Sequence, residues 1–325
     1  MLTHLRLTVP TDLSDRIQEL LLDDECVTNV TLHEGVVLQP PGNLIECDVA
    51  REEADQLLRR LDDAELDRHG GIIVETPTAT PFAAARRLEA AAPGHPDDAV
   101  IWESVEAQAD AGAVATVSYL LFLVFAVMLA AIAVITDSSV LVVGAMVVGP
   151  EFSAIAAASA GIVLLRWNLV FRSMRLLVLS FAFAVAVVTV ASLLMRALGW
   201  ITPELVAQPR PNTGFIWHPD KWSFIVALIA GAAGALALAI QKTATMVGVF
   251  ISVTTVPAAG NLALGLAVWD QGEIVGSLAQ LGANVSGMLI SGTLLLLVVR
   301  RWWPWITTRT ERVLGLRPWS VTTEG

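Results

Sequence analysis

The stretch that decides the fold reads Val148-Gly149-Pro150-Glu151-Phe152-Ser153, and it interrupts an apolar segment that runs from residue 138 to residue 166. A second apolar segment, 243–269, is interrupted at Ser252-Val253-Thr254-Thr255-Val256-Pro257-Ala258-Ala259-Gly260-Asn261. A proline inside a helix removes a backbone donor and clashes with the preceding turn. At membrane depth, irregular backbone is tolerated only where protein or a water-filled cavity surrounds it. A matched pair of breaks therefore predicts a membrane protein whose binding site lies at these breaks.

Six apolar segments are long enough to cross a bilayer, since about 20 apolar residues span its core. They cover about 114–135, 138–165, 174–197, 223–241, 244–269 and 274–299, so the interrupted segments are the second and the fifth. Each half thus has three spans with the broken one in the middle, and Gly149, Pro150, Pro257 and Gly260 are the expected helix-break residues. An odd number of spans per half makes the two halves an inverted repeat. The expected fold is an α-helical polytopic membrane protein with six spans.

Charge divides the 325-residue chain into two parts. Residues 1–112 hold 8 Lys and Arg against 23 Asp and Glu, whereas residues 113–325 hold 12 against 8. The acidic part is expected to be soluble, and its charge argues against nucleic acid or anionic lipid as a partner of this part, because both would repel it. The two cysteines, Cys26 and Cys47, form neither a disulfide framework nor a zinc pattern.

The N-terminal part is expected to be a small α+β domain. Alternation predicts strands at residues 4–9, 27–33, 44–50 and 71–75, with turns at residues 34–35 and 40–43. Amphipathic helices are predicted near residues 11–21 and 51–66. The order βαββαβ is that of the ferredoxin-like fold. We expect this cytoplasmic domain at 1–76, a helical connector at 77–112, a transmembrane domain at 113–300 and a cytoplasmic tail at 301–325.

One face of the predicted sheet carries polar side chains. Its candidate regulatory residues are His4, Arg6, His33, Glu46 and Asp48. Two interpretations are open: a solvated face or subunit contact, and a sensor site for a small ligand or ion. The fold by itself does not choose between them.

Orientation follows from the basic residues near the span ends. The larger positive set lies between spans two and three, between spans four and five, and after span six. Because positive loops stay in the cytoplasm, both termini are expected there. The polar N-terminus carries no apolar signal segment, which agrees with this orientation. The expected location is the inner (plasma) membrane.

The chain also resembles a known family. The residues that carry the resemblance are Gly144 to Phe152, Ala232-Ala233-Gly234-Ala235, Gly248 to Asn261, and Asn284. They are similar to the hydrophobic bacterial and archaeal membrane proteins grouped as domain of unknown function 389. The chain looks like a subgroup with Gly-Pro-Glu-Phe at the first break. The resemblance implies a membrane protein with a cytoplasmic domain and names no substrate.

Glu151 is the first candidate binding residue, because a carboxylate near mid-membrane is costly and usually functional. The alternative is a glutamate that caps its own half-helix after Pro150. Thr254, Thr255 and Asn261 either bind a solute or satisfy the broken backbone. Asn284 and the nearby Gln280 and Ser286 either face the site or bond between helices. The remaining candidate is Ser153, in the first break.

The sequence carries no catalytic triad, phosphate loop or metal-ligand cluster. We therefore expect no enzyme, no cofactor and no metal. The leading hypothesis is a transporter or channel for a small solute or ion, with a regulatory cytoplasmic domain. The alternative is a membrane-anchored sensor or scaffold, and an intramembrane enzyme ranks third. The expected partners are the lipid bilayer, an unidentified small solute or ion, and further copies of the chain in a homo-oligomer.

Overall fold

The computed structural model describes residues 2–92, 95–206, 208–218, 220–242 and 253–314. The chain divides into two compact units. The N-terminal unit comprises residues 1–103 and 302–325, and the helical unit comprises residues 104–301. Each is described by itself below.

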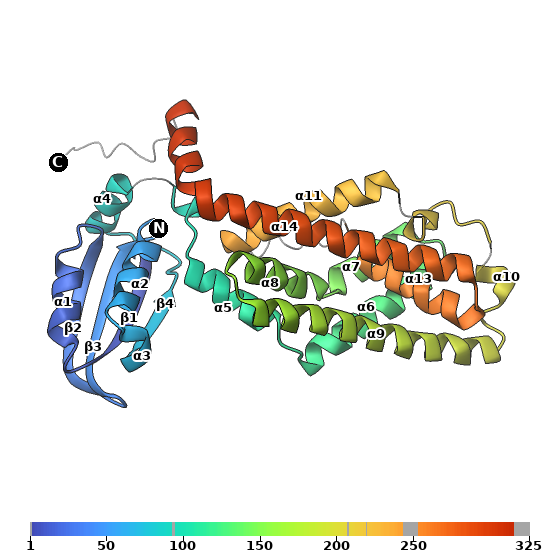
Figure 1. Ribbon diagram of the computed structural model, residues 1–325, viewed down its shortest axis with the longest axis horizontal. Coiled ribbons are helices and arrows are strands. Elements are labelled where there is room, and N and C mark those ends of the chain that lie inside the picture. The colour runs from blue at the N-terminus through green and yellow to red at the C-terminus, as the bar shows by residue number, and fades with distance from the viewer. Residues whose placement is uncertain (1, 93–94, 207, 219, 243–252, 315–325) are drawn as a thin grey trace. The chain divides into compact units, whose positions relative to one another are not determined.

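The N-terminal unit contains an antiparallel four-stranded sheet in the order β2-β3-β1-β4 (Figure 1). Its elements in chain order are β1 (Leu2–Pro10), α1 (Ser14–Leu22), β2 (Val27–Leu38), β3 (Pro41–Ala50), α2 (Ala54–Asp63), α3 (Leu66–His69), β4 (Gly71–Glu75), α4 (Ala83–Ala91) and the 3-10 turn η1 (Pro96–Asp98). The strand and helix order predicted from the sequence is observed, with α3 and α4 added.

The second strand differs from its prediction. It does not end at Glu34-Gly35 but continues to Leu38, with a register irregularity between His33 and Val37. Gly35 adopts φ +65°, and its N–H donates to the Asn43 side chain at 2.9 Å. Glycine enters this left-handed region without steric cost, so the chain forms a bulge there and the strand resumes.

The core of the N-terminal unit lies between the sheet and its helices. Alternate residues of β1, Leu5, Leu7 and Val9, are fully buried and pack with Leu57 of α2. Ile101 joins the same cluster and is 1% exposed. The compact unit therefore includes a residue beyond position 76.

The helical unit is built from long apolar helices. The described helices and turns from residue 102 onward are, in chain order, α5 (Trp102–Gly112), α6 (Val117–Ile135), α7 (Ser139–Val148), α8 (Glu151–Val163), α9 (Trp167–Ala197), α10 (Pro203–Val206), the 3-10 turn η2 (Gly214–Ile216), α11 (Lys221–Ala239), α13 (Thr255–Val268) and α14 (Gln271–Leu314). Four of them are long and apolar enough to cross a membrane: α6, α9, α11 and residues 271–303 of α14. The pair α7 and α8 passes the same test together, with a bend of 54°.

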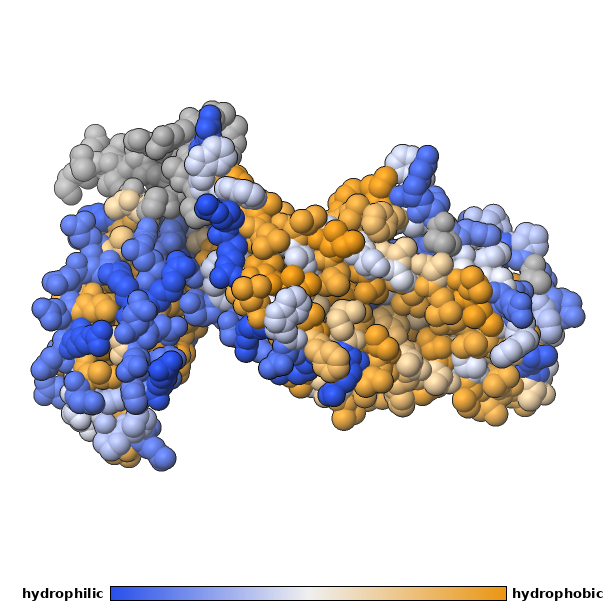
Figure 2. Space-filling model, in the orientation of Figure 1, coloured by the Kyte–Doolittle hydropathy of each residue, from blue (hydrophilic) through white to orange (hydrophobic). Residues whose placement is uncertain are grey.

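The surface of the helical unit agrees with a membrane location. Figure 2 shows broad hydrophobic areas on it. Large apolar side chains such as Phe122, Phe125 and Leu194 are each more than half exposed. Contiguous exposed apolar surface of this extent marks contact with a membrane or another protein. The helical unit is therefore compatible with a membrane protein, as the composition predicted.

The predicted spans differ from the observed helices in two places. The third predicted span began at residue 174, but α9 begins at Trp167, so Arg172, which was expected before the span, lies within the helix. The first part of the fifth predicted span, residues 244–252, lies outside the described residues, and the described remainder is α13. Among the described residues, four single helices and one bent pair are long and apolar enough to cross a membrane, whereas six spans were predicted.

The two halves of the helical unit have matching helix bounds. Residue numbers in α11 exceed those in α6 by 104 at both ends, since the helices cover 117–135 and 221–239. The same difference separates the starts of α8 and α13, at 151 and 255, and those of α9 and α14, at 167 and 271. The same difference of 104 separates non-glycine residues with positive φ, since Asp137 is matched by Gln241 and Leu165 by Trp269. At this spacing, the counterpart of α7 is 243–252, which lies outside the described residues.

Candidate functional site

The first break separates α7 from α8 at Gly149 and Pro150. Pro150 precedes the first residue of α8, Glu151, and offers no backbone N–H to continue α7. The Ser153 hydroxyl donates to the Pro150 carbonyl oxygen at 2.9 Å. Ser153, one of the predicted binding residues, thus satisfies the broken backbone.

The second break places its proline inside a helix. Thr254 precedes α13, and Pro257 is the third residue of that helix. In the first turn a missing N–H costs nothing, because the first backbone donors have no intrahelical partner. Gly260 lies farther along α13, where a Cβ atom would be 2.7 Å from the Ala130 Cβ of α6. Its absent side chain lets α13 and α6 pack closely.

The two breaks meet. A Cβ atom placed on Gly149 would lie 2.7 Å from the Val256 Cγ2 atom, and the Glu151 carboxylate borders the same point. Val256 is the second residue of α13, and Glu151 is the first of α8. The N-terminal ends of these two half-helices therefore lie beside each other.

The other ends of the half-helices point to opposite ends of the bundle. Arg300 of α14 donates to the Val163 carbonyl at the end of α8, and Arg196 of α9 donates to the Ala267 carbonyl near the end of α13, at 2.6 Å. These two arginines are again separated by 104 residues. In Figure 1 α9 and α14 run in opposite directions along the bundle.

Glu151 is buried at this meeting point. Its residue is 7% exposed, and its Oε2 atom has no hydrogen-bond partner among the described residues. Each helix N-terminus carries a positive partial charge of roughly half an elementary charge. The ends of α8 and α13 therefore favour a negative charge on this carboxylate, and its free oxygen leaves one position for a proton or a cation.

A polar cluster lies next to the start of α13. The Thr254 hydroxyl accepts from the Gln280 amide at 2.8 Å and from the Asn284 amide at 3.0 Å, and both amides belong to α14. The Gln280 Oε1 and Thr255 Oγ1 atoms are buried without a hydrogen-bond partner among the described residues. The structure thus joins the predicted residues Thr254 and Asn284, and it leaves two oxygens free for a further interaction.

Asn261 belongs to a different cluster. Its side-chain oxygen accepts from Arg210 at 2.9 Å, and its amide donates to Glu273 at 2.5 Å and to Ser277 at 2.8 Å. Arg210 also forms an ion pair with Glu273, and both side chains are 6% exposed. Asn261 therefore has its hydrogen bonds supplied within the protein.

Sequence reasoning missed this second cluster. In the sequence, Arg210 and Glu273 were considered only as charges in a loop and at the end of a span. They pair although they are 63 positions apart, and no local sequence pattern indicates this contact. Ser286, considered with Asn284, donates to the Gly282 carbonyl of its own helix and is exposed. It does not join either cluster.

The N-terminal unit places its five candidate residues on one sheet face. His4 and Asp48 are opposite each other on β1 and β3, with Nδ1 and Oδ1 2.8 Å apart. Arg6 is opposite Glu46 in the same register. His33 pairs with Leu44 on the neighbouring strand. His4 and Asp48 thus form a hydrogen-bonded pair on this face, Arg6 lies opposite Glu46, and His33 lies on the neighbouring strand.

A buried acid of the N-terminal unit was not predicted. Both carboxylate oxygens of Glu52 are buried without a hydrogen-bond partner among the described residues. Desolvation by burial raises the pKa of Glu52 to about 7. The Glu52 carboxyl therefore changes its charge near neutral pH. Its position just before a helix was the sequence feature that could have indicated a buried acid here.

Comparison with known proteins gives one match. Residues 146–290 match the family model described as Domain of unknown function (DUF389). These residues include both breaks and the polar clusters, together with most of the two halves. No curated protein and no solved structure matches the chain.

Proposed function

Because this match supports membership of the chain in the DUF389 family, a family defined without an activity, we propose a function from the site itself. The helical unit is a membrane transporter or channel that carries a proton or a small cation past Glu151. The observation that carries this proposal is the buried carboxylate with one free oxygen where two half-helices meet.

The proposal includes an inverted repeat. The constant spacing of 104 residues between helix bounds supports it, because two halves of three spans each, an odd number, would have opposite orientations. The two arginines that bind the ends of α8 and α13 occupy equivalent positions at opposite ends of the bundle. In such repeats the substrate site lies at the repeat interface near the bilayer midplane.

The chemistry of the site favours a proton or cation. A carboxylate inside a membrane is retained where it pairs with another group or relays an ion. No ion-pair partner contacts Glu151 among the described residues, so a bound proton or cation would neutralise it. Thr255 and Gln280 have free buried oxygens near the second break, and hard cations prefer such oxygen ligands. Thr254 and Asn284 hold Gln280 in position.

The N-terminal unit is proposed as the regulatory domain. Its antiparallel order β2-β3-β1-β4 supports the ferredoxin-like assignment. The sensor alternative draws on the same unit, through the sheet face with His4 and Asp48 and through Glu52. The proposal places both termini in the cytoplasm and the protein in the inner (plasma) membrane, as a homo-oligomer without enzymatic activity.

Ion flux tests the proposed function directly. The full chain is purified in detergent and reconstituted in liposomes that contain a pH-sensitive dye, and a potassium gradient with valinomycin sets the membrane potential. We expect faster proton entry than in protein-free liposomes, or the same acceleration with a sodium-sensitive dye and external sodium. Rates equal to those of protein-free liposomes with both ions would contradict the proposal, provided that the protein is folded and inserted.

A further inference from the structure

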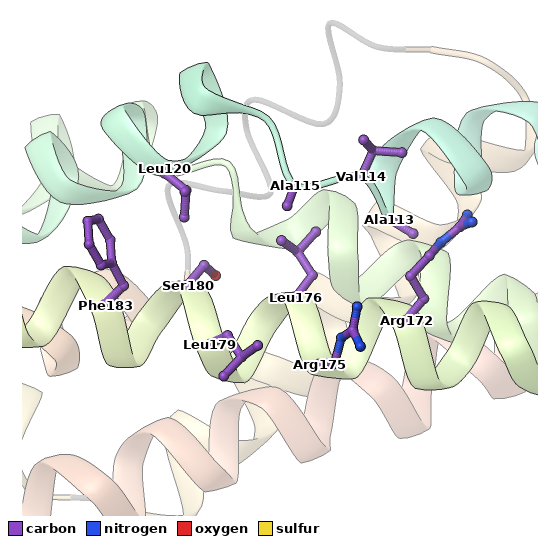
Figure 3. Close-up of a pocket in the computed structure, with 10 residues that line it drawn as sticks. All are labelled: Ala113, Val114, Ala115, Leu120, Arg172, Arg175, Leu176, Leu179, Ser180 and Phe183. Atoms are coloured by element: carbon purple, nitrogen blue, oxygen red, sulfur yellow. The ribbon is translucent and has the colours of Figure 1, made fainter.

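A groove of about 440 Å³ lies between α9 and the start of α6. Figure 3 shows its lining residues, which come from one face of α9, from Leu120 of α6, and from the short segment 113–115 before α6. The volume is within the range of small-molecule sites, about 300–1,000 Å³. Glu151 is not among the residues that line the groove, and the groove was not predicted from the sequence.

One end of the groove is cationic. Arg172 and Arg175 line it, one turn apart on α9. Arg172 is held by Asp110 of α5, with Nη2 and Oδ1 2.5 Å apart. Arg175 is exposed and has no ion-pair or hydrogen-bond partner among the described residues. Its guanidinium is therefore available to an anion.

Asp110 accounts for the difference between these two arginines. It binds Arg166 at 2.7 Å as well as Arg172. Desolvation raises the pKa of Asp110, but the hydrogen bonds from the two arginines outweigh it and lower that pKa below its usual value. Asp110 therefore stays ionised at neutral pH and keeps Arg172 engaged. The unengaged charge at the groove is that of Arg175.

Apart from Ser180, the rest of the groove is lined by apolar residues. Leu176 is buried at its wall, while Leu179 is 60% exposed and Phe183 is 50% exposed. The distance along α9 from Arg172 to Phe183 is about 16 Å, at about 1.5 Å per residue. The cationic end lies toward the start of α9, which is the end of a membrane helix, and the apolar end lies deeper. This polarity matches an amphiphile that stands in one bilayer leaflet.

We propose that this groove binds an anionic phospholipid of the membrane. The phosphate of its headgroup pairs with Arg175, because guanidinium and phosphate form charge-assisted hydrogen bonds. One acyl chain lies along Leu176, Leu179 and Phe183, where it replaces bulk lipid contacts. Basic pockets between membrane helices bind acidic headgroups in this way. A free phosphate would use only the cationic end and leave the apolar wall without a ligand.

Native mass spectrometry of the full chain in detergent tests the proposal. The probes are phosphatidylglycerol, phosphatidylcholine of equal chain length, and inorganic phosphate. We expect a retained phosphatidylglycerol adduct, at least about tenfold tighter than the phosphatidylcholine adduct, a factor that corresponds to about 1.4 kcal/mol. Both headgroups carry the phosphate, but the choline cation of phosphatidylcholine balances its charge and is repelled by Arg175. Arg175→Gln should remove this preference.

Two matched controls make the result decisive. Arg301→Gln removes another exposed arginine, in α14 outside the groove, and should keep the preference. Leu179→Ser should weaken phosphatidylglycerol binding, whereas Val178→Ser, exposed on the same helix but outside the groove lining, should not. The proposal is overturned if Arg175→Gln keeps the full preference or if Arg301→Gln loses it equally. Competition by inorganic phosphate at equal concentration would instead assign a free-anion site and also overturn it.

Discussion

Glu151→Gln is expected to reduce ion flux through reconstituted protein to the level of protein-free liposomes. Glutamine keeps the shape of the side chain and its hydrogen-bonding capacity but carries no titratable charge, so it offers a proton no place to bind. The carboxylate is buried at the ends of α8 and α13, and its Oε2 atom has no hydrogen-bond partner among the described residues, so the variant removes the group proposed to bind the ion. The measurement is the liposome assay, with equal protein incorporation verified for each sample.

The matched control for this variant is Glu204→Gln, which removes an exposed acid of α10 outside the membrane spans. It should leave the flux unchanged. If Glu151→Gln lowers the midpoint of thermal unfolding strongly and the protein misfolds, Glu151 acts as the cap of α8. If it folds and conducts like the parent protein, the ion site is elsewhere.

The second large effect is expected at the buried pair of Arg210 and Glu273. Glu273→Leu leaves the arginine charge buried without its carboxylate, and removing one partner of such a pair costs about 3–5 kcal/mol. Both side chains are only 6% exposed, so water does not replace the lost partner easily. We expect a clear drop in the midpoint of thermal unfolding in detergent.

The double variant Arg210→Met/Glu273→Leu separates charge burial from packing. Replacing both members of a buried pair by apolar residues is often close to neutral, so it should recover most of the loss. Glu204→Leu, at an exposed site, should have little effect. Equal unfolding midpoints for Glu273→Leu and the parent protein would show that the pair is not buried as described.

The breaks themselves were accessible to sequence reasoning. Pro150 is incompatible with an uninterrupted α7–α8 helix for a local reason, its missing backbone donor, and the local sequence records it. The β-strands of the N-terminal unit are equally local, since alternation places Leu5, Leu7 and Val9 on one face. Where the sequence misled, as at Gly35, a bulge and a turn use the same residue type.

The contacts of the site were not accessible in the same way. Asn261 was assigned to the break because Pro257 is four residues away, yet its amide binds Glu273 on another helix. Arg210 reaches this pair from a loop, and no periodicity encodes that contact. The spacing of 104 residues, by contrast, is present in the sequence but has few identical residues, so it became clear only from the helix bounds.

Cysteine cross-linking in native membranes tests most directly whether the two half-helices meet at their N-termini. Cys26 and Cys47 are first replaced, so that the introduced cysteines are the only thiols. The double variant Gly149→Cys/Val256→Cys is then oxidised, and its remaining free thiols are counted after denaturation by labelling with a maleimide-linked polymer. Ser159→Cys/Gly292→Cys is the positive control, because a Cβ at Gly292 lies 3.5 Å from the Ser159 Cβ, near the distance of about 3.8 Å found in disulfides. Gly144→Cys/Val256→Cys is the negative control, since nothing lies within 4 Å of a Cβ at Gly144.

We predict that the 149/256 pair and the 159/292 control lose both free thiols on oxidation and that the 144/256 control keeps them. Free thiols at 149 and 256, with the 159/292 pair cross-linked, would contradict it.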